Sequence, residues 1–178
     1  MTREPSAAIR PEEARDSHAI RRVNELAFGG PIEANLVDAL RDADAVILSL
    51  VAEVAGSVVG HILFSAVTIE TAAPEVTALG LAPMAVHPEH QRRRIGSQLV
   101  EEGLRELRRR GYEAVVVVGH PDYYPRFGFA RASGFGLRCA IECPDEAFMA
   151  IELRPGALAI RAGLVRYRPE FTSVRSAR

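Results

Sequence analysis

Three consecutive arginines, residues 92–94, stand directly before a segment with the periodicity of a helix. Ile95, Gly96 and Ser97 follow them at the start of that segment. The N-terminal end of a helix carries partial positive charge, so cations are unfavourable there while the site is empty. The unpaired N–H groups of a first helical turn bind anions, and a bound anion makes nearby arginines favourable. The pattern therefore indicates an anion site, with plain solvation of three surface arginines as the alternative.

The sequence lacks the two common nucleotide-binding motifs that place a phosphate at a helix N-terminus. Residues 92–97 contain no Gly-Lys-Ser/Thr, which a P-loop requires, and no G-x-G-x-x-G fingerprint occurs in the chain. Gly96 has no side chain, so a ligand could approach the backbone closely at this position. The sequence therefore predicts anion binding outside the common nucleotide motifs.

The elements around this loop predict a parallel βαβ unit. The helix is expected from Ile95 to about Arg110 and ends at Gly111, a residue type common after helix C-termini. Largely apolar runs at 77–86 and 112–119 flank it and are typical of buried strands. The apolar face of the helix comprises Ile95, Leu99, Val100, Gly103, Leu104 and Leu107.

The remaining patterns predict a mixed sheet with helices on both faces, and hence an α/β fold. One helix is expected within residues 14–28, with Asp16 or Ser17 as its N-cap. In a second helix, at 32–43, Ile32, Leu36 and Leu40 would share the buried face. Short strands or apolar runs are expected at 7–11, 46–53, 57–70, 136–142, 147–153 and 157–167.

Composition and charge exclude several classes of protein. The 178 residues fit one domain, with or without an appendage. Lys plus Arg number 22 against 23 for Asp plus Glu, and this balance argues against a general polyanion binder. The apolar stretch 45–67 contains Glu53, His61 and a break at 55–57, so it is interpreted as a β-hairpin and not as a membrane span.

The two cysteines predict neither a disulfide nor a metal site. Cys139 and Cys143 have no second Cys or His pair nearby at zinc spacing, so two reduced thiols are expected. The first ten residues lack the apolar core of a secretion signal. Together these observations favour a cytoplasmic protein without membrane attachment.

Two blocks of the sequence resemble the GNAT superfamily of N-acetyltransferases, and within it the YhbS-type branch. "LAPMAVHPEHQRRRIGS" resembles the acetyl-CoA site, whose signature is Gln/Arg-x-x-Gly-x-Gly/Ala at a helix start. Gln91 and Gly96 match that signature, whereas Arg94 takes the place of its first glycine. "GHPDYYPRFGF" resembles the Tyr-x-x-x-Gly-Phe element of the family, with Tyr124 and residues 128–129 at the same spacing.

The resemblance covers about residues 8–167 and implies a GNAT fold. This fold has a central, mixed, mostly antiparallel twisted sheet with helices on both faces. The sheet is expected to splay between its fourth strand, at 77–86, and its fifth, at 112–119. Residues 1–7 are expected to be a loose N-terminus and 8–154 the N-acetyltransferase domain. Residues 155–178 would form a C-terminal extension that completes this domain or packs on it.

The resemblance also implies where acetyl-CoA, the co-substrate, binds. Main-chain groups of the strand would bond the pantetheine amides and the acetyl carbonyl. The pyrophosphate would lie on amides from Gln91 or Arg92 to Ser97, with charge from Arg92 or Arg93. For Arg94 two outcomes are open: weaker CoA binding, or a side chain turned outward while its amide is still used. The full set of expected binding residues is Met84, Ala85, Val86, Gln91, Arg92, Arg93, Arg94, Ile95, Gly96 and Ser97.

The implied reaction is direct attack of a primary amine on the thioester in a ternary complex, without a metal. The leaving thiolate needs a proton, and a tyrosine hydroxyl is a suitable donor. By family spacing this residue is Tyr124, with Tyr123 as second choice and a packing role as the alternative. The general base stays open. The candidates are His61, His120, Asp122, Glu33 and an ordered water, and for His61 a structural role is favoured.

Two other functions are possible from the sequence. A GNAT-fold module could hold acyl-CoA without turnover, but Tyr124 favours the enzyme. An RNA-associated role for arginines 92–94 and 105–110 is disfavoured by the formal net charge of −1 and the lack of interleaved aromatic residues. The acceptor would be a small amine, a polyamine, an antibiotic or a protein, and the enzyme a monomer or homodimer.

Overall fold

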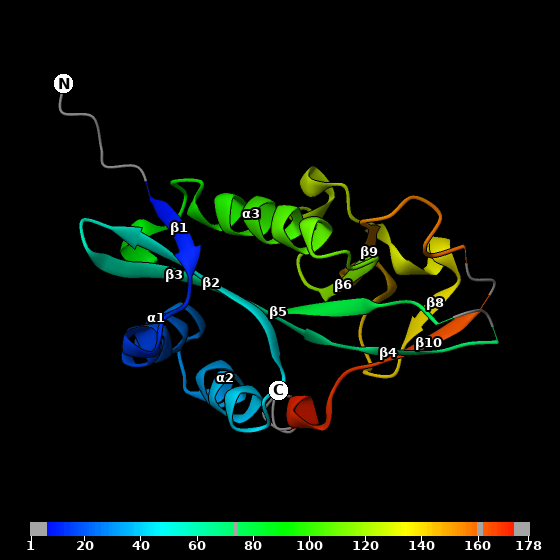
Figure 1. Ribbon diagram of the computed structural model, residues 1–178, viewed down its shortest axis with the longest axis horizontal. Helices are drawn as coiled ribbons and strands as arrows, with labels where there is room; N and C mark the ends of the chain where they lie inside the picture. The colour runs from blue at the N-terminus through cyan, green and yellow to red at the C-terminus, as the bar shows by residue number, and fades with distance from the viewer. Residues whose placement is uncertain (1–6, 73–74, 160–161, 173–178) are drawn as a thin grey trace. The chain divides into compact units, whose positions relative to one another are not determined.

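Strand β5 (Ala78–Val86) and helix α3 (Ile95–Arg109) flank the arginines (Figure 1). Each contributes residues to both of the two compact units into which the chain divides. Unit 1 comprises residues 1–64, 83–103 and 170–178, and unit 2 comprises residues 65–82 and 104–169. The computed structural model describes residues 7–72, 75–159 and 162–172. Most of the expected loose N-terminus, and parts of the expected C-terminal extension, lie outside these described residues.

Unit 1 orders its strands as β1 (Ala8–Pro11), β2 (Val46–Val54), β3 (Ser57–Ala66) and the end of β5. β1 pairs with β2 in antiparallel register, from Ala8 opposite Glu53. The predicted hairpin is confirmed, because Ala55 and Gly56 form a two-residue turn with φ of 50° and 79° between β2 and β3.

The two faces of β3 carry different helices in unit 1. Adjacent strand residues point to opposite faces. A Cβ atom on Gly60 would lie 3.0 Å from a side-chain carbon of Leu99 on α3. His61 is instead hydrogen-bonded, at 3.2 Å, to Asn24 of α1 (Ser17–Phe28). Figure 1 shows the same arrangement, with α1 and α2 (Ile32–Asp42) across the strands from α3. Helices on both faces of the sheet are therefore confirmed here.

Helix α3 lies close on the sheet because Gly103 has no side chain. A Cβ atom there would come within 2.6 Å of the Phe64 ring on β3. The predicted apolar face of the helix is buried, with Leu99 and Leu107 wholly inaccessible. Gly111 follows the helix with φ 83°, and its N–H donates to the carbonyl of Arg108 at 3.1 Å, as predicted for a C-terminal cap.

Two details of the first helices differ from the prediction. Asp16 occupies the N-cap of α1, but its carboxylate does not cap that helix; it accepts from the N–H of Glu13 at 2.8 Å and from Arg10. In α2, Leu36 and Leu40 are buried, whereas Ile32 is only half-buried. Glu33 takes the buried place at the start of α2, with 9% of its surface exposed.

Unit 2 contains the predicted parallel pair. β5 pairs with β6 (Ala114–Val118) in parallel register from Ala78 opposite Ala114 to Gly80 opposite Val116. β9 (Phe148–Glu152) then pairs antiparallel with β6 and with β7 (Ala130–Arg131). The sheets of the two units thus share β5 and are mixed but mostly antiparallel, as expected.

A second, small sheet in unit 2 was not predicted. The run 57–70 does not form one strand, because the Val67 N–H donates to the Ala78 carbonyl at 3.2 Å and the chain changes partners there. Beyond that point β4 (Thr68–Glu70) pairs antiparallel with β10 (Gly163–Arg166). β10 also pairs in parallel with β8 (Leu137–Cys139), the only part of the run 136–142 that is a strand in the described structure.

Candidate active site

The loop between β5 and α3 is tied to the end of its strand by Gln91. A short 3₁₀ turn, Pro88–His90, follows the strand, and the Gln91 N–H closes it on the Pro88 carbonyl at 3.3 Å. The Gln91 side chain donates to the Val86 carbonyl at 3.1 Å. Since both groups of Gln91 already bond within the loop, Gln91 positions the loop, and the amides that can face a ligand begin at Arg92.

Arg92 and Arg94 both adopt the left-handed conformation, with φ of 61° and 63°. Non-glycine residues rarely adopt it, since it costs about 1–2 kcal/mol per residue. Gln91 before them is extended, with φ −65° and ψ 160°, and the helix begins directly after them at Ile95. A left-handed residue next to a right-handed one turns their N–H groups toward one concave side, which is the geometry of an anion-binding nest, and Arg94 followed by the helical Ile95 has this pattern. Arg94, which takes the place of a signature glycine, thus adopts a backbone conformation that glycine adopts freely.

The start of α3 completes the row of amides. The first hydrogen bond that enters the helix runs from the Gln98 N–H to the Arg94 carbonyl, at 3.0 Å. The amides of Ile95, Gly96 and Ser97 precede this ladder, as the first amides of any helix do. Ile95 is buried, with 4% of its surface exposed, and fixes the helix on unit 1, while Gly96 and Ser97 are half-buried.

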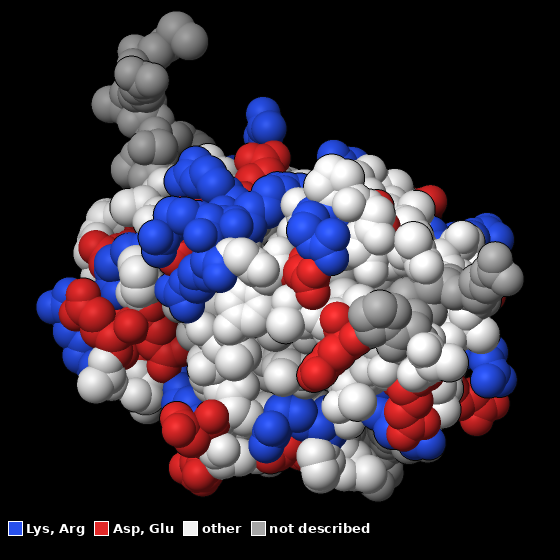
Figure 2. Space-filling model, turned by 45° about the vertical axis from the view of Figure 1, so that its right-hand side comes forward, with Lys and Arg blue, Asp and Glu red and all other residues white. Residues whose placement is uncertain are grey.

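The arginine side chains of the loop are exposed to solvent. The chain has no lysine, so every basic side chain in Figure 2 is an arginine. Figure 2 shows one large basic area on this face, with acidic side chains beside it, and smaller basic patches elsewhere. Such an arrangement favours anionic ligands locally without a large net charge.

The strand residues expected to bind pantetheine lie at the end of β5 in unit 1. Ala85 is buried, with 2% of its surface exposed, whereas Met84 and Val86 are half-buried. Just beyond the strand, the His87 N–H donates to the Val59 carbonyl of β3 at 2.8 Å. The structure thus brings the predicted strand and loop residues, 84–86 and 91–97, together in one unit.

Tyr124 lies in unit 2, at the start of a 3₁₀ turn, Tyr124–Phe127, that follows β6. Its side chain is buried, with 7% of its surface exposed, and it meets Tyr123 and Phe129 edge to face at 5.2 and 5.6 Å. Burial, and secondarily Tyr123, raises the pKa of the Tyr124 hydroxyl above its ordinary value of 10. The phenol is protonated at neutral pH, as a tyrosine of ordinary pKa also is, and the raised pKa makes it a weaker acid than an exposed tyrosine.

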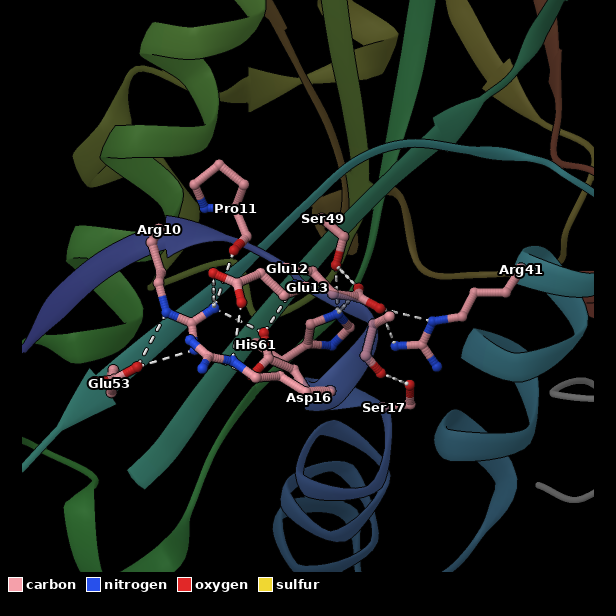
Figure 3. Close-up of polar contacts among 12 residues, drawn as sticks. Arg10, Pro11, Glu12, Glu13, Asp16, Ser17, Arg41, Ser49, Glu53 and His61 are labelled. Atoms are coloured by element: carbon pink, nitrogen blue, oxygen red, sulfur yellow. Dashed lines mark hydrogen bonds and ion pairs between the residues drawn. The ribbon is translucent and has the colours of Figure 1, made fainter. Parts of the chain in front are cut away.

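His61 is not suited to act as a base. It is fully buried, and burial together with the positive charge of Arg41 lowers its pKa to about 3. Its Nδ1 lies 3.2 Å from Asn24 Nδ2 and its Nε2 lies 3.0 Å from Ser49 Oγ. The favoured structural role for His61 is thus supported by its surroundings in unit 1 (Figure 3).

Sequence patterns did not reveal the rest of this polar network. Ser49 Oγ donates to the Glu12 carboxylate, and Arg41 Nε donates to the other oxygen of Glu12 at 2.8 Å. These residues come from β2, from the segment after β1 and from α2, so no short motif joins them (Figure 3). A polar residue inside an apolar strand, such as Ser49 in "VILSLVAEV", was the available signal.

The other candidates divide by exposure. His120 and Asp122 are exposed in unit 2, whereas Glu33 is buried in unit 1. Cys139 and Cys143 are half-buried, and neither forms a disulfide in the described residues. In the part of the chain that the structure describes, no group of three or more His, Cys, Asp or Glu side chains could hold a metal ion. No helix of these described residues combines the length and hydropathy of a membrane span.

Comparison with known proteins identifies the family. A family model described as an acetyltransferase (GNAT) domain matches residues 8–132. The uncharacterized N-acetyltransferase YhbS of Escherichia coli K12 is 37% identical over 164 residues, which are 92% of this chain and 97% of that protein. The uncharacterized N-acetyltransferase YjhQ of the same strain is 40% identical over 121 residues, 67% of each chain.

Solved structures agree with these sequence matches. The crystal structure of E. coli YhbS in complex with CoA has a TM-score of 0.89 at 35% identity, covering 97% of this chain and 95% of that one. A GNAT family acetyltransferase from Brucella melitensis in complex with acetyl-CoA has a TM-score of 0.77 at 37% identity, covering 93% and 97%. The chain therefore belongs to the GNAT superfamily and is an N-acetyltransferase.

Proposed function

We propose that this enzyme transfers the acetyl group of acetyl-CoA to a primary amine by direct attack. The observation that carries the proposal is the loop 92–97, where two arginines with positive φ precede the unpaired first turn of α3. Loop amides of this kind suit a pyrophosphate. The relatives solved with CoA and with acetyl-CoA support the choice of ligand.

The residues present fit this co-substrate. The amides of Arg92 to Ser97 would hold the pyrophosphate, with Gln91 bracing the loop on Val86. The guanidinium groups of Arg92 and Arg93 would add charge-assisted bonds to the phosphate oxygens. The main chain of Met84, Ala85 and Val86 would bond the pantetheine arm and the acetyl carbonyl. When bound, acetyl-CoA supplies the activated acetyl group.

The chain's own contribution to the chemistry would be positioning and proton transfer. An acceptor amine attacks the thioester carbonyl, a C–N bond forms, the C–S bond breaks, and the nitrogen gives up one proton to the base that the sequence leaves open. N–H groups near Ala85 would stabilise the negative charge that develops on the carbonyl oxygen. Tyr124 would give its hydroxyl proton to the leaving sulfur, and its burial and protonated state support this role.

Calorimetric titration with acetyl-CoA tests the binding part. The double variant Arg92→Glu, Arg93→Glu should weaken binding at least tenfold, because it places negative charge beside the phosphates. A double variant of matched charge, Arg105→Glu with Arg108→Glu, changes exposed residues farther along α3 and should bind within about twofold of the parent. Undetectable binding by the parent at millimolar acetyl-CoA would contradict the proposal.

A panel of amines tests the transfer part, with release of free CoA thiol as the readout. The panel should include polyamines, small amines, amine antibiotics and peptides with a free N-terminus or lysine. Tyr124→Phe should lower kcat about 100-fold and leave the Kd for acetyl-CoA unchanged, since general acid catalysis contributes about 10²–10⁴-fold. Full activity of this variant would show that another group protonates the thiolate. Binding without transfer to any amine would instead indicate an acyl-CoA-binding module.

A further inference from the structure

Gly119 directly follows β6, and the ring of Tyr124 packs against it. A Cβ atom on Gly119 would lie 2.4 Å from Tyr124 Cε2, 3.1 Å from Cδ2 and 3.4 Å from Cζ. Ordinary carbon contacts begin at about 3.4 Å, so the nearest ring atom would have to retreat by about 1 Å. Both residues belong to unit 2. The ring thus occupies the space that any side chain at position 119 would need.

The glycine is required for space and not for conformation. Gly119 does not have the positive φ that distinguishes Gly128, at 96°, in the same segment. Alanine could therefore adopt the backbone conformation of residue 119 without the left-handed penalty. An effect of Gly119→Ala would come from the contact with the tyrosine ring.

The backbone on one side of this contact is held in place. The Gly119 N–H donates to the Ala147 carbonyl at 2.9 Å. The preceding residue, Val118, pairs with Phe148 of β9 in the sheet of unit 2. A new methyl group at position 119 could not withdraw without breaking these bonds, so the ring would have to move instead.

On the other side of this contact, the Tyr124 ring is enclosed by other aromatic rings. Tyr123 and Phe129 meet it edge to face, and the side chain is 93% buried. Such aromatic contacts fix a ring by shape, and a shift of about 1 Å would carry the hydroxyl with it. A displacement of that size at a reacting group costs about 100-fold in rate.

We propose that Gly119 is a positioning residue for the Tyr124 hydroxyl, because its missing side chain lets the ring lie against the end of β6. This inference rests on the proposed role of Tyr124 as the proton donor to the thiolate. Gly119 itself would contact neither substrate, and it would affect catalysis only through the position of Tyr124.

A double-mutant cycle tests the proposal. Gly119→Ala should lower kcat about 10- to 100-fold and leave the Kd for acetyl-CoA unchanged. In the Tyr124→Phe background the same change should alter kcat less than about threefold, since the hydroxyl that it displaces is already absent. Gly134→Ala is the matched control, because nothing lies within 4 Å of a Cβ there and its φ is not positive, and its kcat should equal that of the parent.

The outcomes separate this inference from the proposed function. A Tyr124→Phe variant with full kcat would refute the acid role, whatever Gly119→Ala does. A Tyr124→Phe variant that loses rate, together with a fully active Gly119→Ala, would refute the positioning role alone. An equal loss from Gly119→Ala in both backgrounds would show a general structural effect and would also overturn it.

Two measurements do not depend on activity. The chain has no tryptophan, so its near-ultraviolet circular dichroism reports chiefly the four tyrosines, and Gly119→Ala should change it whereas Gly134→Ala should not. If Gly119→Ala does not fold, Tyr124→Leu should restore folding by removing the ring. A double variant that stays unfolded while Tyr124→Leu alone folds would place the clash elsewhere and contradict the inference.

Discussion

Arg94, the residue that departs from the family signature, adopts a left-handed backbone conformation. Its φ of 63° lies in the region that glycine adopts freely and other residues rarely adopt. Arg92, two residues earlier, has φ 61°. The loop thus accepts a conformational cost of about 1–2 kcal/mol per residue. Of the two outcomes expected for Arg94, we predict the second, in which the amide remains in use.

Arg94→Gly and Arg94→Ala separate the backbone of residue 94 from its charge. Both variants remove the same guanidinium, but only glycine removes the left-handed penalty. Because the loop already holds this conformation, the two variants should bind acetyl-CoA with Kd values within about threefold of each other. Arg94→Gly should unfold with a free energy up to about 1 kcal/mol higher than Arg94→Ala. Calorimetry and urea denaturation measure these quantities; binding tenfold tighter for glycine than for alanine would contradict the expectation.

Several elements of unit 1 are joined by the polar network around His61. The histidine lies on β3, Ser49 on β2, Asn24 on α1 and Arg41 on α2. Asn24 Nδ2 also donates to the Ile20 carbonyl at 2.9 Å, so its amide group faces His61 as a donor. His61 therefore accepts at Nδ1 and donates from Nε2 to Ser49, a pattern that only the neutral ring allows. The network stabilises unit 1 while His61 is uncharged.

Acid should destabilise the protein through His61. The folded-state pKa is about 3, whereas an unfolded histidine titrates near 6.5, so the unfolded chain binds the extra proton between these values. The free energy of unfolding should consequently fall by up to about 1.4 kcal/mol per pH unit below pH 6.5. Below pH 4 the loss of the Asp16 charge, whose pKa the Arg10 hydrogen bond lowers to about 2, should add to it.

Urea denaturation between pH 7 and pH 4.5 measures this dependence. Arg41 and Glu12 are the charged groups that face the His61 ring, and neither changes in the test variants. His61→Gln should flatten the slope, and His18→Gln, at an exposed position of α1, should keep it. A parent protein equally stable at pH 7 and pH 4.5 would show that His61 is protonated in the folded state.

At the scale of the whole molecule, charge is balanced in total but not in distribution. The chain has 22 Arg against 23 Asp and Glu, yet the face in Figure 2 carries one large basic area besides several smaller basic patches. Acidic side chains beside that area weaken its positive electrostatic potential. Salt also screens this potential beyond about 8 Å at physiological ionic strength. The charge pattern suits a compact anion better than a long polyanion.

Binding of RNA and of CoA should therefore differ sharply. At physiological ionic strength we expect RNA to bind more weakly than about 10⁻⁵ M, within the range of non-specific binding. Acetyl-CoA binding should persist under the same conditions and weaken only modestly with added salt. Fluorescence anisotropy with labelled RNA and calorimetry with acetyl-CoA measure the two. Tight RNA binding with a steep salt dependence would support the RNA-associated alternative.

The local elements could be predicted from the sequence because their signals lie within a few residues. The apolar faces of α3, the hairpin at 55–56 and the cap at Gly111 each follow from periodicity or residue type. The βαβ unit around the arginines follows from the lengths of three adjacent elements. The run 57–70 was wrong as one strand, because its break at Val67 depends on partners distant in the chain, at Ala78 and in β10.

The sequence by itself determined the family and the local helices and strands around the loop 92–97, whereas the residues that bind acetyl-CoA there stay a prediction. Tertiary structure alone decided the state of particular groups. The positive φ of Arg94, the neutral form of His61 and the space that Gly119 leaves for Tyr124 depend on neighbours that folding brings together. Short-range steric and hydrogen-bonding preferences are encoded in neighbouring residues, whereas burial and close contact arise only when distant segments pack.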